Sequence, residues 1–228
     1  MKKSQVLVAD APNAGSSEPL DPKVDGKAKP RVRERIIEAA TELFYRHGIN
    51  NVGIDAIVSE AGTNKMSLYR NFSSKEDLVV QYLQDHEQEH LAERDALMNR
   101  YLGDPRGQIE AFFELMVEKC HDKDTCGCPS ANVAIELRGQ AHPALEIVHA
   151  GRQSLRNNFC ELLAAAGAKK PDLLSDTLIL LIEGGLMSKV TFKDEDWPAK
   201  NLLSIVKRLL DAELPPSTAT STSASGKI

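Results

Sequence analysis

The apolar residues of this chain recur at helical spacing, and this periodicity limits the fold more than any other feature. Near the N-terminus, Ile36, Ala40, Leu43 and Phe44 fall on one helical face, and Gly48 follows as a residue suited to end a helix. No segment shows the alternation of Val, Ile or Thr that is typical of a strand. The fold class is therefore predicted to be all-α, with helices over about 31–46, 54–61, 65–71, 75–101, 105–121, 130–138, 142–166, 171–191 and 197–212.

The prolines support these boundaries. Five of them stand near predicted helix starts, where the missing N–H of proline costs least: Pro105, Pro129, Pro143, Pro171 and Pro198. Composition then separates the two ends of the chain from its helical part. Residues 1–29 are rich in Pro, Gly, Ser, Asp and Lys and are predicted to be a disordered basic arm, and the Ser/Thr-rich residues 213–228 are predicted to be a disordered tail.

Charge gives no simple indication of the partner. The net charge is -5, with 12 Lys and Arg against 11 Asp and Glu in residues 1–80, and 16 against 22 in the rest of the chain. A role in nucleic-acid binding must therefore rest on where the charges lie. No apolar run approaches the roughly 18 to 20 residues of a membrane-spanning helix, and the apolar patch 6–9 is shorter than the roughly 7 to 15 residues of a signal peptide. We expect a cytoplasmic protein without a membrane partner.

The stretch GTNKMSLYRNF, residues 62–72, indicates a helix-turn-helix. A glycine turn separates two short helices, and the second of them, capped by Asn64, can enter a major groove. Leu68 and Phe72 are four residues apart and are predicted to face the core, which leaves Lys65, Met66, Tyr69 and Arg70 outward. This face offers donors for phosphate or guanine and an apolar contact for thymine. Periodicity alone is equally compatible with an ordinary solvated helix.

Residues 33–78 resemble the N-terminal DNA-binding domain of TetR-family transcriptional regulators. The resemblance rests on the order and spacing of several short motifs: Ala40, Leu43, Phe44 and Gly48; Ile57 with Ala61 and Gly62; Leu68, Tyr69 and Phe72; and Ser74, Lys75 and Glu76. It implies a three-helix DNA-binding domain with a helix-turn-helix over residues 30–77, followed by a helical ligand-binding and dimerisation domain over residues 78–212. It further implies a homodimer on a palindromic double-stranded DNA operator, and a repressor released by a small-molecule effector.

The resemblance also assigns DNA contacts. Together with the outward face, it predicts a DNA-binding set of Lys65, Met66, Ser67, Tyr69, Arg70, Asn71 and Lys75. Three positions depart from the family pattern. Met66 replaces a small residue, Asn71 replaces a frequent His, and Gly53 lacks the hydroxyl that often caps the second helix and contacts phosphate. A basic cluster precedes the domain and is suited to backbone or minor-groove contacts, or equally to a solubilising tail: Lys27, Lys29, Arg31, Arg33 and Arg35.

Two further residue sets are predicted in the C-terminal part. Small residues beside leucines on two late helices favour a dimer interface of Gly184, Gly185, Ser188, Leu202, Ile205, Val206 and Leu209, although the same pattern suits an intramolecular core. Apolar side chains predicted to line an effector cavity, or simply to fill the core, are Phe112, Phe113, Met116, Cys120, Phe159, Leu163 and Leu180.

The cysteines supply the alternative function. Cys120, His121, Cys126 and Cys128 lie close together in sequence and are of types that bind zinc or copper, so a metal- or thiol-sensing regulator, or a metal or thiol enzyme, is the alternative. The Cys-Gly-Cys spacing is shorter than in structural zinc sites. No catalytic motif is recognisable, so we expect no enzyme activity, no metal and no cofactor.

Overall fold

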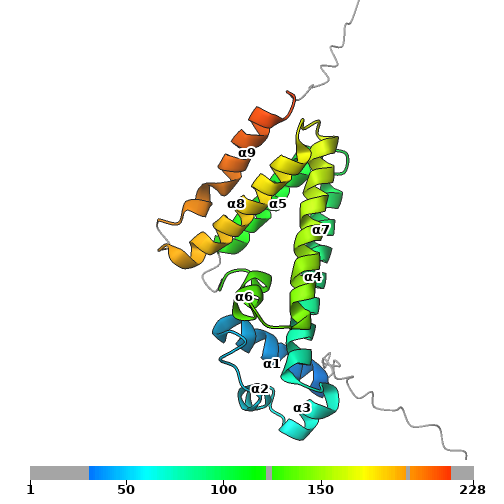
Figure 1. Ribbon diagram of the computed structural model, residues 1–228, viewed down its shortest axis with the longest axis vertical. Coiled ribbons are helices and arrows are strands. Elements are labelled where there is room, and N and C mark those ends of the chain that lie inside the picture. Colours follow the sequence, from blue (N-terminus) through cyan, green and yellow to red (C-terminus); the bar gives the residue numbers. More distant parts are fainter. Residues whose placement is uncertain (1–30, 122–124, 194–195, 217–228) are drawn as a thin grey trace, which may run out of the picture. The chain divides into compact units, whose positions relative to one another are not determined.

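The computed structural model describes residues 31–121, 125–193 and 196–216, and every regular element among them is a helix (Figure 1). The elements are α1 Val32–His47, α2 Ile54–Glu60, α3 Lys65–Asn71, α4 Lys75–Arg100, α5 Pro105–His121, α6 Pro129–Glu136, α7 Pro143–Ala165, α8 Pro171–Thr191, the 3-10 helix η1 Pro198–Asn201 and α9 Leu202–Glu213. The predicted all-α fold is confirmed, and each predicted boundary lies within two residues of the observed one. The predicted arm 1–29 lies outside the described residues.

Local capping explains why the helix-turn-helix begins and ends where the sequence predicts. Asn64 Oδ1 accepts a hydrogen bond from the Ser67 amide at 2.9 Å, so it caps α3. Before it, Gly62 adopts a φ of 57°, its amide donates to Ser59 O, and the Thr63 amide donates to Val58 O. These two bonds form a Schellman motif, which ends α2 at a left-handed glycine. The turn between α2 and α3 is therefore encoded within six residues.

The first hydrophobic core reaches beyond the predicted DNA-binding segment. It joins α1, α2 and α3 to the first turns of α4, to α6 and to the start of α7, through buried residues that include Ile36, Phe44, Ile57, Leu68, Leu83, Val133 and Val148. The predicted boundary between residues 77 and 78 falls within the first turn of α4, which begins at Lys75. Packing nevertheless crosses it, because α6 and α7 supply apolar side chains to the same core.

The second core is built by α5, the later part of α7, α8, η1 and α9. Phe113 and Phe159 lie at its centre with ring centroids 6.0 Å apart, and both side chains are fully buried. Leu214 is also buried here, one residue after the end of α9. The prediction that the disordered tail begins at 213 is therefore wrong for its first two residues, since Glu213 is helical and Leu214 packs in the core.

Candidate DNA-binding surface and effector cavity

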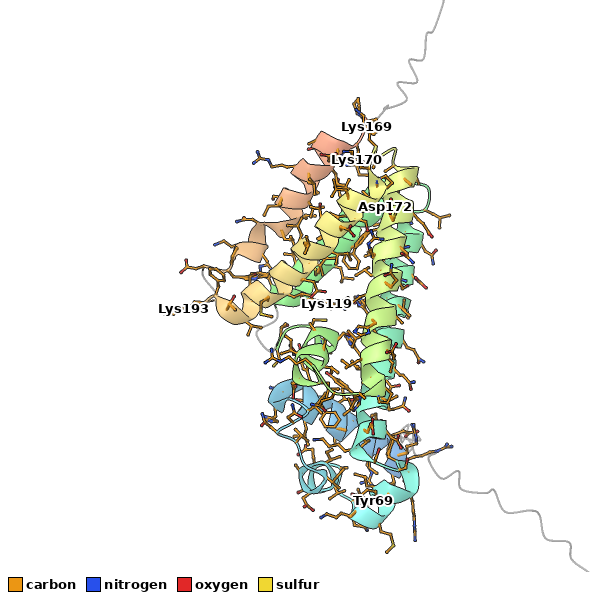
Figure 2. All side chains as sticks on the ribbon, viewed as in Figure 1. Tyr69, Lys119, Lys169, Lys170, Asp172 and Lys193 are labelled. Atoms are coloured by element: carbon orange, nitrogen blue, oxygen red, sulfur yellow. The ribbon has the colours of Figure 1, made fainter. Side chains whose placement is uncertain are left out.

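The outward face of α3 carries the side chains that the sequence predicts. Leu68 and Phe72 are buried, whereas Met66 is 68% exposed and Tyr69 53% exposed. Figure 2 labels Tyr69 at the α3 end of the described helices. Lys65 and Arg70 are also exposed, and Ser67 is half-buried. The periodic pattern placed each of these side chains correctly, because the two core residues fix the rotation of the helix.

Local contacts organise this face. Lys65 Nζ lies 2.8 Å from Asp55 Oδ1 of α2, and this hydrogen bond and charge raise the pKa of Lys65. Arg70 Nη2 lies 3.6 Å from Met66 Sδ, and Asn71 Nδ2 donates to Ser67 O at 2.8 Å. The Lys65–Asp55 pair is exposed to solvent, so it is weak and a phosphate can replace the carboxylate. Cationic and apolar groups thus stand together on one exposed surface.

Lys75 does not join this exposed surface. Its Nζ donates to Ile49 O at 2.5 Å and lies 6.0 Å from the centroid of the Phe44 ring. Burial lowers the pKa of Lys75, and the neighbouring Glu136 carboxylate opposes this shift. In this structure the lysine holds the turn after α1, and the DNA contact that was assigned to it by resemblance stays a prediction.

Two arginines of the predicted basic cluster contact the folded domain. Arg33 Nη2 donates to Gln81 at 2.7 Å, and its guanidinium lies 4.9 Å from the centroid of the Phe72 ring. Arg35 Nη1 donates to Gly62 O at 3.4 Å, at the C-terminal end of α2. Both side chains therefore contact and stabilise the helix-turn-helix. Lys27 and Lys29 lie outside the described residues.

A cavity of about 840 Å³ lies between the two cores. Its walls come from α1, α4, α5, the segment 125–130, α7 and α8. Apolar side chains form much of the wall, among them Ile37, Phe112, Leu115, Met116, Leu155, Ile182 and Leu186. Lys119, labelled in Figure 2, lines it from α5 and pairs with Glu93 of α4. Volume and lining are those of a small-molecule site, because ligand pockets are mostly apolar with a few polar groups.

The predicted cavity residues separate into two groups. Phe112, Met116 and Cys120 do line the cavity. Phe113, Phe159 and Leu163 are fully buried in the second core and are not among the described residues that line this cavity, so their contact with a ligand stays a prediction. Leu180 is 72% exposed on α8. Helical spacing shows that a side chain is apolar and faces inward, but it does not distinguish a cavity wall from the packing behind it.

The predicted dimer residues also separate. Gly185, Ser188, Leu202 and Val206 are buried within the chain, and a side chain at Gly185 would begin 3.1 Å from Leu202. These four belong to the packing within the chain, and their part in a dimer interface stays a prediction. Gly184 and Ile205 are exposed and Leu209 is half-buried. The predicted interface did not include three exposed apolar residues on the outer face of α8, namely Leu173, Leu180 and Met187. Their helical spacing, with Gly184 between the last two, is the signal that could have identified this face.

The cysteine cluster does not gather into a metal site. No group of three or more His, Cys, Asp or Glu side chains is placed to hold a metal ion within residues 31–121, 125–193 and 196–216. His121 packs against Trp197, with ring centroids 5.1 Å apart, and its Nδ1 lies 2.8 Å from Val117 O.

Among the described residues, no helix is long and apolar enough to cross a membrane.

A capped recognition helix with exposed basic and polar side chains, mounted on a three-helix core, defines a helix-turn-helix DNA-binding protein. Comparison with known families gives the same class. Residues 36–82 match the model of the bacterial regulatory proteins of the tetR family, and residues 105–197 match the C-terminal domain of LmrA/YxaF-like transcriptional regulators. The chain belongs to the TetR family of transcriptional regulators.

Individual relatives resemble the chain over most of their length. The HTH-type transcriptional regulator LmrA of Bacillus subtilis is 28% identical over 182 residues, which cover 78% of this chain and 96% of LmrA. The HTH-type transcriptional repressor DhaR of a Mycobacterium species is 24% identical over 190 residues, which cover 78% of this chain and 92% of DhaR. The crystal structure of SCO4454, a TetR-family regulator from Streptomyces coelicolor, superposes with a TM-score of 0.75 at 30% identity, and covers 80% of this chain and 95% of that one.

Proposed function

We propose that the chain is a transcriptional repressor that binds a palindromic operator as a homodimer and is released when a small molecule occupies the cavity. The observation that carries this proposal is the cavity itself. It takes Ile37 and Tyr45 from α1 and Tyr82 from α4, so the helix that supports the recognition helix is also a wall of the ligand site. A ligand that changes this wall also changes the support of α3. Because a repressor acts where its operator lies, the proposal includes a cytoplasmic location.

Operator binding is assigned to the exposed face of α3. We propose that Lys65 and Arg70 contact phosphates or guanine, and that Tyr69 and Met66 add apolar and stacking contacts at the base edges. Contacts with the DNA backbone are assigned to two further residues of the same helix, the half-buried Ser67 and the exposed Asn71. Repression, rather than activation, is supported by the name of the relative DhaR, which matches over most of both chains.

Dimerisation is assigned to the outer face of α8 with the exposed side of α9. Leu173, Leu180, Met187 and Ile205 are exposed large apolar side chains, and Gly184 lies beside them on α8. Exposed large apolar side chains on neighbouring positions of one helix face favour a protein partner. Because a symmetric dimer uses the same surface of both copies, a single face is sufficient for a second copy of this chain. Sedimentation equilibrium should give twice the chain mass.

Effector release requires that DNA and effector prefer different arrangements of the same helices. The first turns of α4 belong to the first core, and the middle of α4 lines the cavity with Asp85, His86 and His90. We propose that ligand binding moves this helix and changes the separation of the two recognition helices in the dimer. The effector then weakens DNA binding by the same factor by which DNA weakens effector binding.

The test is a titration of the purified chain against labelled duplex taken from upstream of its own gene, with scrambled duplex as competitor, at two salt concentrations. Specific binding that survives scrambled competitor is the expected result, and affinity should fall with salt as phosphate contacts release counterions. Equal competition by scrambled duplex would contradict the proposal. A compound library screened in the same assay should then contain molecules that release the duplex.

A further inference from the structure

Cys128 lies in the cavity wall, at the N-terminal end of α6, and a cation lies against its sulfur. Arg152 of α7 places Nη2 3.1 Å from Cys128 Sγ, and its Nε lies 2.9 Å from Glu183 Oε1 of α8. Both Cys128 and Arg152 line the cavity. On the other side, Ser130 Oγ donates to Glu87 Oε1 of α4 at 2.6 Å. Four helices therefore meet around one thiol that faces a space large enough for a ligand.

This surrounding favours the negatively charged form of the thiol. Burial raises the pKa of Cys128, but a hydrogen bond with His86 and the charge of Arg152 outweigh burial, so the pKa lies below its ordinary value. The charged form of Arg152 is favoured as well. Burial lowers the pKa of Arg152, but the charges of Cys128 and Glu183 outweigh this effect and raise it. A thiolate beside a guanidinium is the reactive state of cysteine, since the thiolate is the nucleophile.

The other cysteines of the chain serve as internal comparisons. Burial raises the pKa of Cys120, and a hydrogen bond with Asp172 raises the pKa of Cys160 on the outer surface. Cys126 lies only two residues from Cys128 and is half-buried, but it does not line the cavity among the described residues. A lowered pKa, contact with a cation and a place in the cavity wall are therefore found together at Cys128.

We propose that Cys128 is a covalent modification site, at which the sulfur adds to conjugated carbonyl compounds, such as enones and quinones, that enter the cavity. The sulfur lone pair forms a C–S bond to the β-carbon, and the C=C electron pair moves through the carbonyl group to its oxygen. The resulting enolate takes a proton from water, so the adduct contains all atoms of the acceptor and no oxidant is needed. The apolar wall accommodates the carbon skeleton, and the cation beside the sulfur favours attack by the thiolate.

The position of α6 explains how such an adduct would reach the DNA-binding helices. At the start of α6, the Cys126 amide donates to the Tyr45 hydroxyl of α1 at 2.9 Å, and that hydroxyl donates to Gly127 O at 3.2 Å. At the end of α6, the Glu136 carboxylate accepts hydrogen bonds from the amides of Ile49 at 3.0 Å and Asn50 at 2.8 Å. Both ends of this eight-residue helix are bonded to α1 or to the turn that follows it. A group attached to Cys128 therefore displaces a helix on which the helix-turn-helix rests.

The first test measures the chemistry alone. The full chain, reduced, is treated at pH 7 with less than one equivalent of N-ethylmaleimide, a cyclic conjugated dicarbonyl, and the adduct is located by peptide mass mapping. Cys128 is expected to react first, at least about tenfold faster than the same residue in the chain unfolded by guanidinium chloride, because more of it is thiolate. Cys128→Ser should remove the fast adduct, whereas Cys126→Ser, in the same segment, should keep it. Arg152→Gln should slow the reaction, and Arg152→Lys should restore part of the rate.

Two outcomes would overturn the proposal. One is first reaction at Cys126 or Cys160, and the other is a rate at Cys128 no greater in the folded chain than in the unfolded one. The pH profile gives a further check, because the midpoint of the reaction rate should lie below that of the unfolded thiol. The groups that can shift this midpoint come from every helix around the sulfur: Tyr45, Tyr82, His86, Glu87, Cys120, Arg152 and Glu183.

The second test measures regulation, and this part rests on the proposed operator binding. The alkylated chain is expected to lose at least about tenfold in operator affinity, within the usual range of coupling between sites. N-ethylsuccinimide, which has the same shape but no C=C bond, should leave the affinity unchanged, as should treatment of Cys128→Ser with the maleimide. Full alkylation at Cys128 without loss of affinity would overturn the regulatory role. If the untreated chain fails to bind any specific duplex, the proposed function fails, but the result on thiol chemistry stands.

Discussion

The two hydrophobic cores of this protein differ in what they place at the surface. The first core, which joins α1 to α3 with the first turns of α4, with α6 and with the start of α7, orients a short helix with exposed cationic and polar side chains. The second core, around α5, α8 and α9, contains the stacked Phe113 and Phe159 and presents an apolar outer face on α8. The cavity lies between them and takes wall residues from both. The proposed DNA-binding surface and the proposed dimer surface thus belong to different cores, and the cavity takes wall residues from both.

The difference also has an energetic side. The second core contains the stacked Phe113 and Phe159, whose loss leaves a cavity, whereas the first core is next to a turn that α6 and α4 hold by hydrogen bonds. Mutations in the second core should therefore mainly change global stability. Mutations at the contacts around the turn should change DNA binding more than stability.

The largest effect is expected for Phe159→Ala. Phe159 is fully buried and lies against Phe112 and Phe113, with ring centroids 5.1 and 6.0 Å away. Its truncation should lower the free energy of unfolding by about 3–5 kcal/mol, measured by urea denaturation. Leu102→Ala, at a side chain that is 77% exposed, is the matched control and should change stability by less than about 0.5 kcal/mol. Because α4 and α7 belong to both regions, one transition should shift as a whole. Two transitions, of which only one shifts, would show that the cores are independent.

The second largest effect is expected for the pair Lys65→Ala and Tyr69→Ala. Loss of both outward side chains should weaken operator binding by about 2–4 kcal/mol, measured by fluorescence anisotropy, with little change in the melting temperature. The slope of log affinity against log salt should become shallower by about 0.9 for each phosphate that the variant no longer neutralises. Lys169→Ala, at the opposite end of the described helices from Tyr69 in Figure 2, should leave binding and slope unchanged. Unaltered affinity in the double variant would refute the assignment of α3.

A smaller effect is expected for Glu136→Ala, which joins the two regions. Its carboxylate accepts hydrogen bonds from the amides of Ile49 and Asn50, and removal leaves both donors without this partner. The cost should be about 1–3 kcal/mol, seen as faster hydrogen exchange at these two amides and weaker operator binding. Glu136→Gln keeps one acceptor oxygen, so its exchange rates and operator affinity should lie between those of Glu136→Ala and those of the wild type. Normal exchange at both amides in Glu136→Ala would mean that α6 does not support the turn.

The smallest effect is a pH dependence at His90, which lines the cavity between the two cores. Burial, followed by the charge of Lys119, lowers the pKa of His90 below its ordinary value of 6.5. The folded protein therefore binds fewer protons than the unfolded chain just below pH 6.5, so stability should fall as pH drops through that interval. His90→Gln should reduce this loss of stability at acid pH, measured by urea titrations between pH 7 and pH 5. The exposed His149→Gln is the control, and an identical loss of stability in wild type and His90→Gln would contradict the prediction.

Much of the fold follows from local chemistry. Helix boundaries were predictable to within two residues because prolines, caps and glycine turns act over a few positions, as at Asn64 and Gly62. The face of α3 was predictable for the same reason, since Leu68 and Phe72 are four residues apart. The orientation of Lys75 was not, because the acceptor that holds it, Ile49 O, lies 26 residues earlier in the chain.

The outcome on α8 and α9 shows where periodicity stops being informative. Gly184 and Gly185 are neighbours in the sequence, yet Gly185 is buried against Leu202 while Gly184 is exposed. Both stripes of α8 are largely apolar, so the sequence could not tell which one packs within the chain. The same ambiguity applies to Phe113, which is fully buried in the second core.

The sequence by itself determined the all-α fold, the helix-turn-helix and its outward residues, because these depend on spacing and capping within one or two turns. Only the tertiary structure decided the cavity, the inner and outer faces of α8, and the meeting of Cys128 with Arg152, 24 residues away, and of Glu136 with Ile49, 87 residues away. These features depend on how helices that are distant in sequence pack together. Cys128 is the clearest case, since a guanidinium and an imidazole from two other helices lower the pKa of its thiol against the effect of burial.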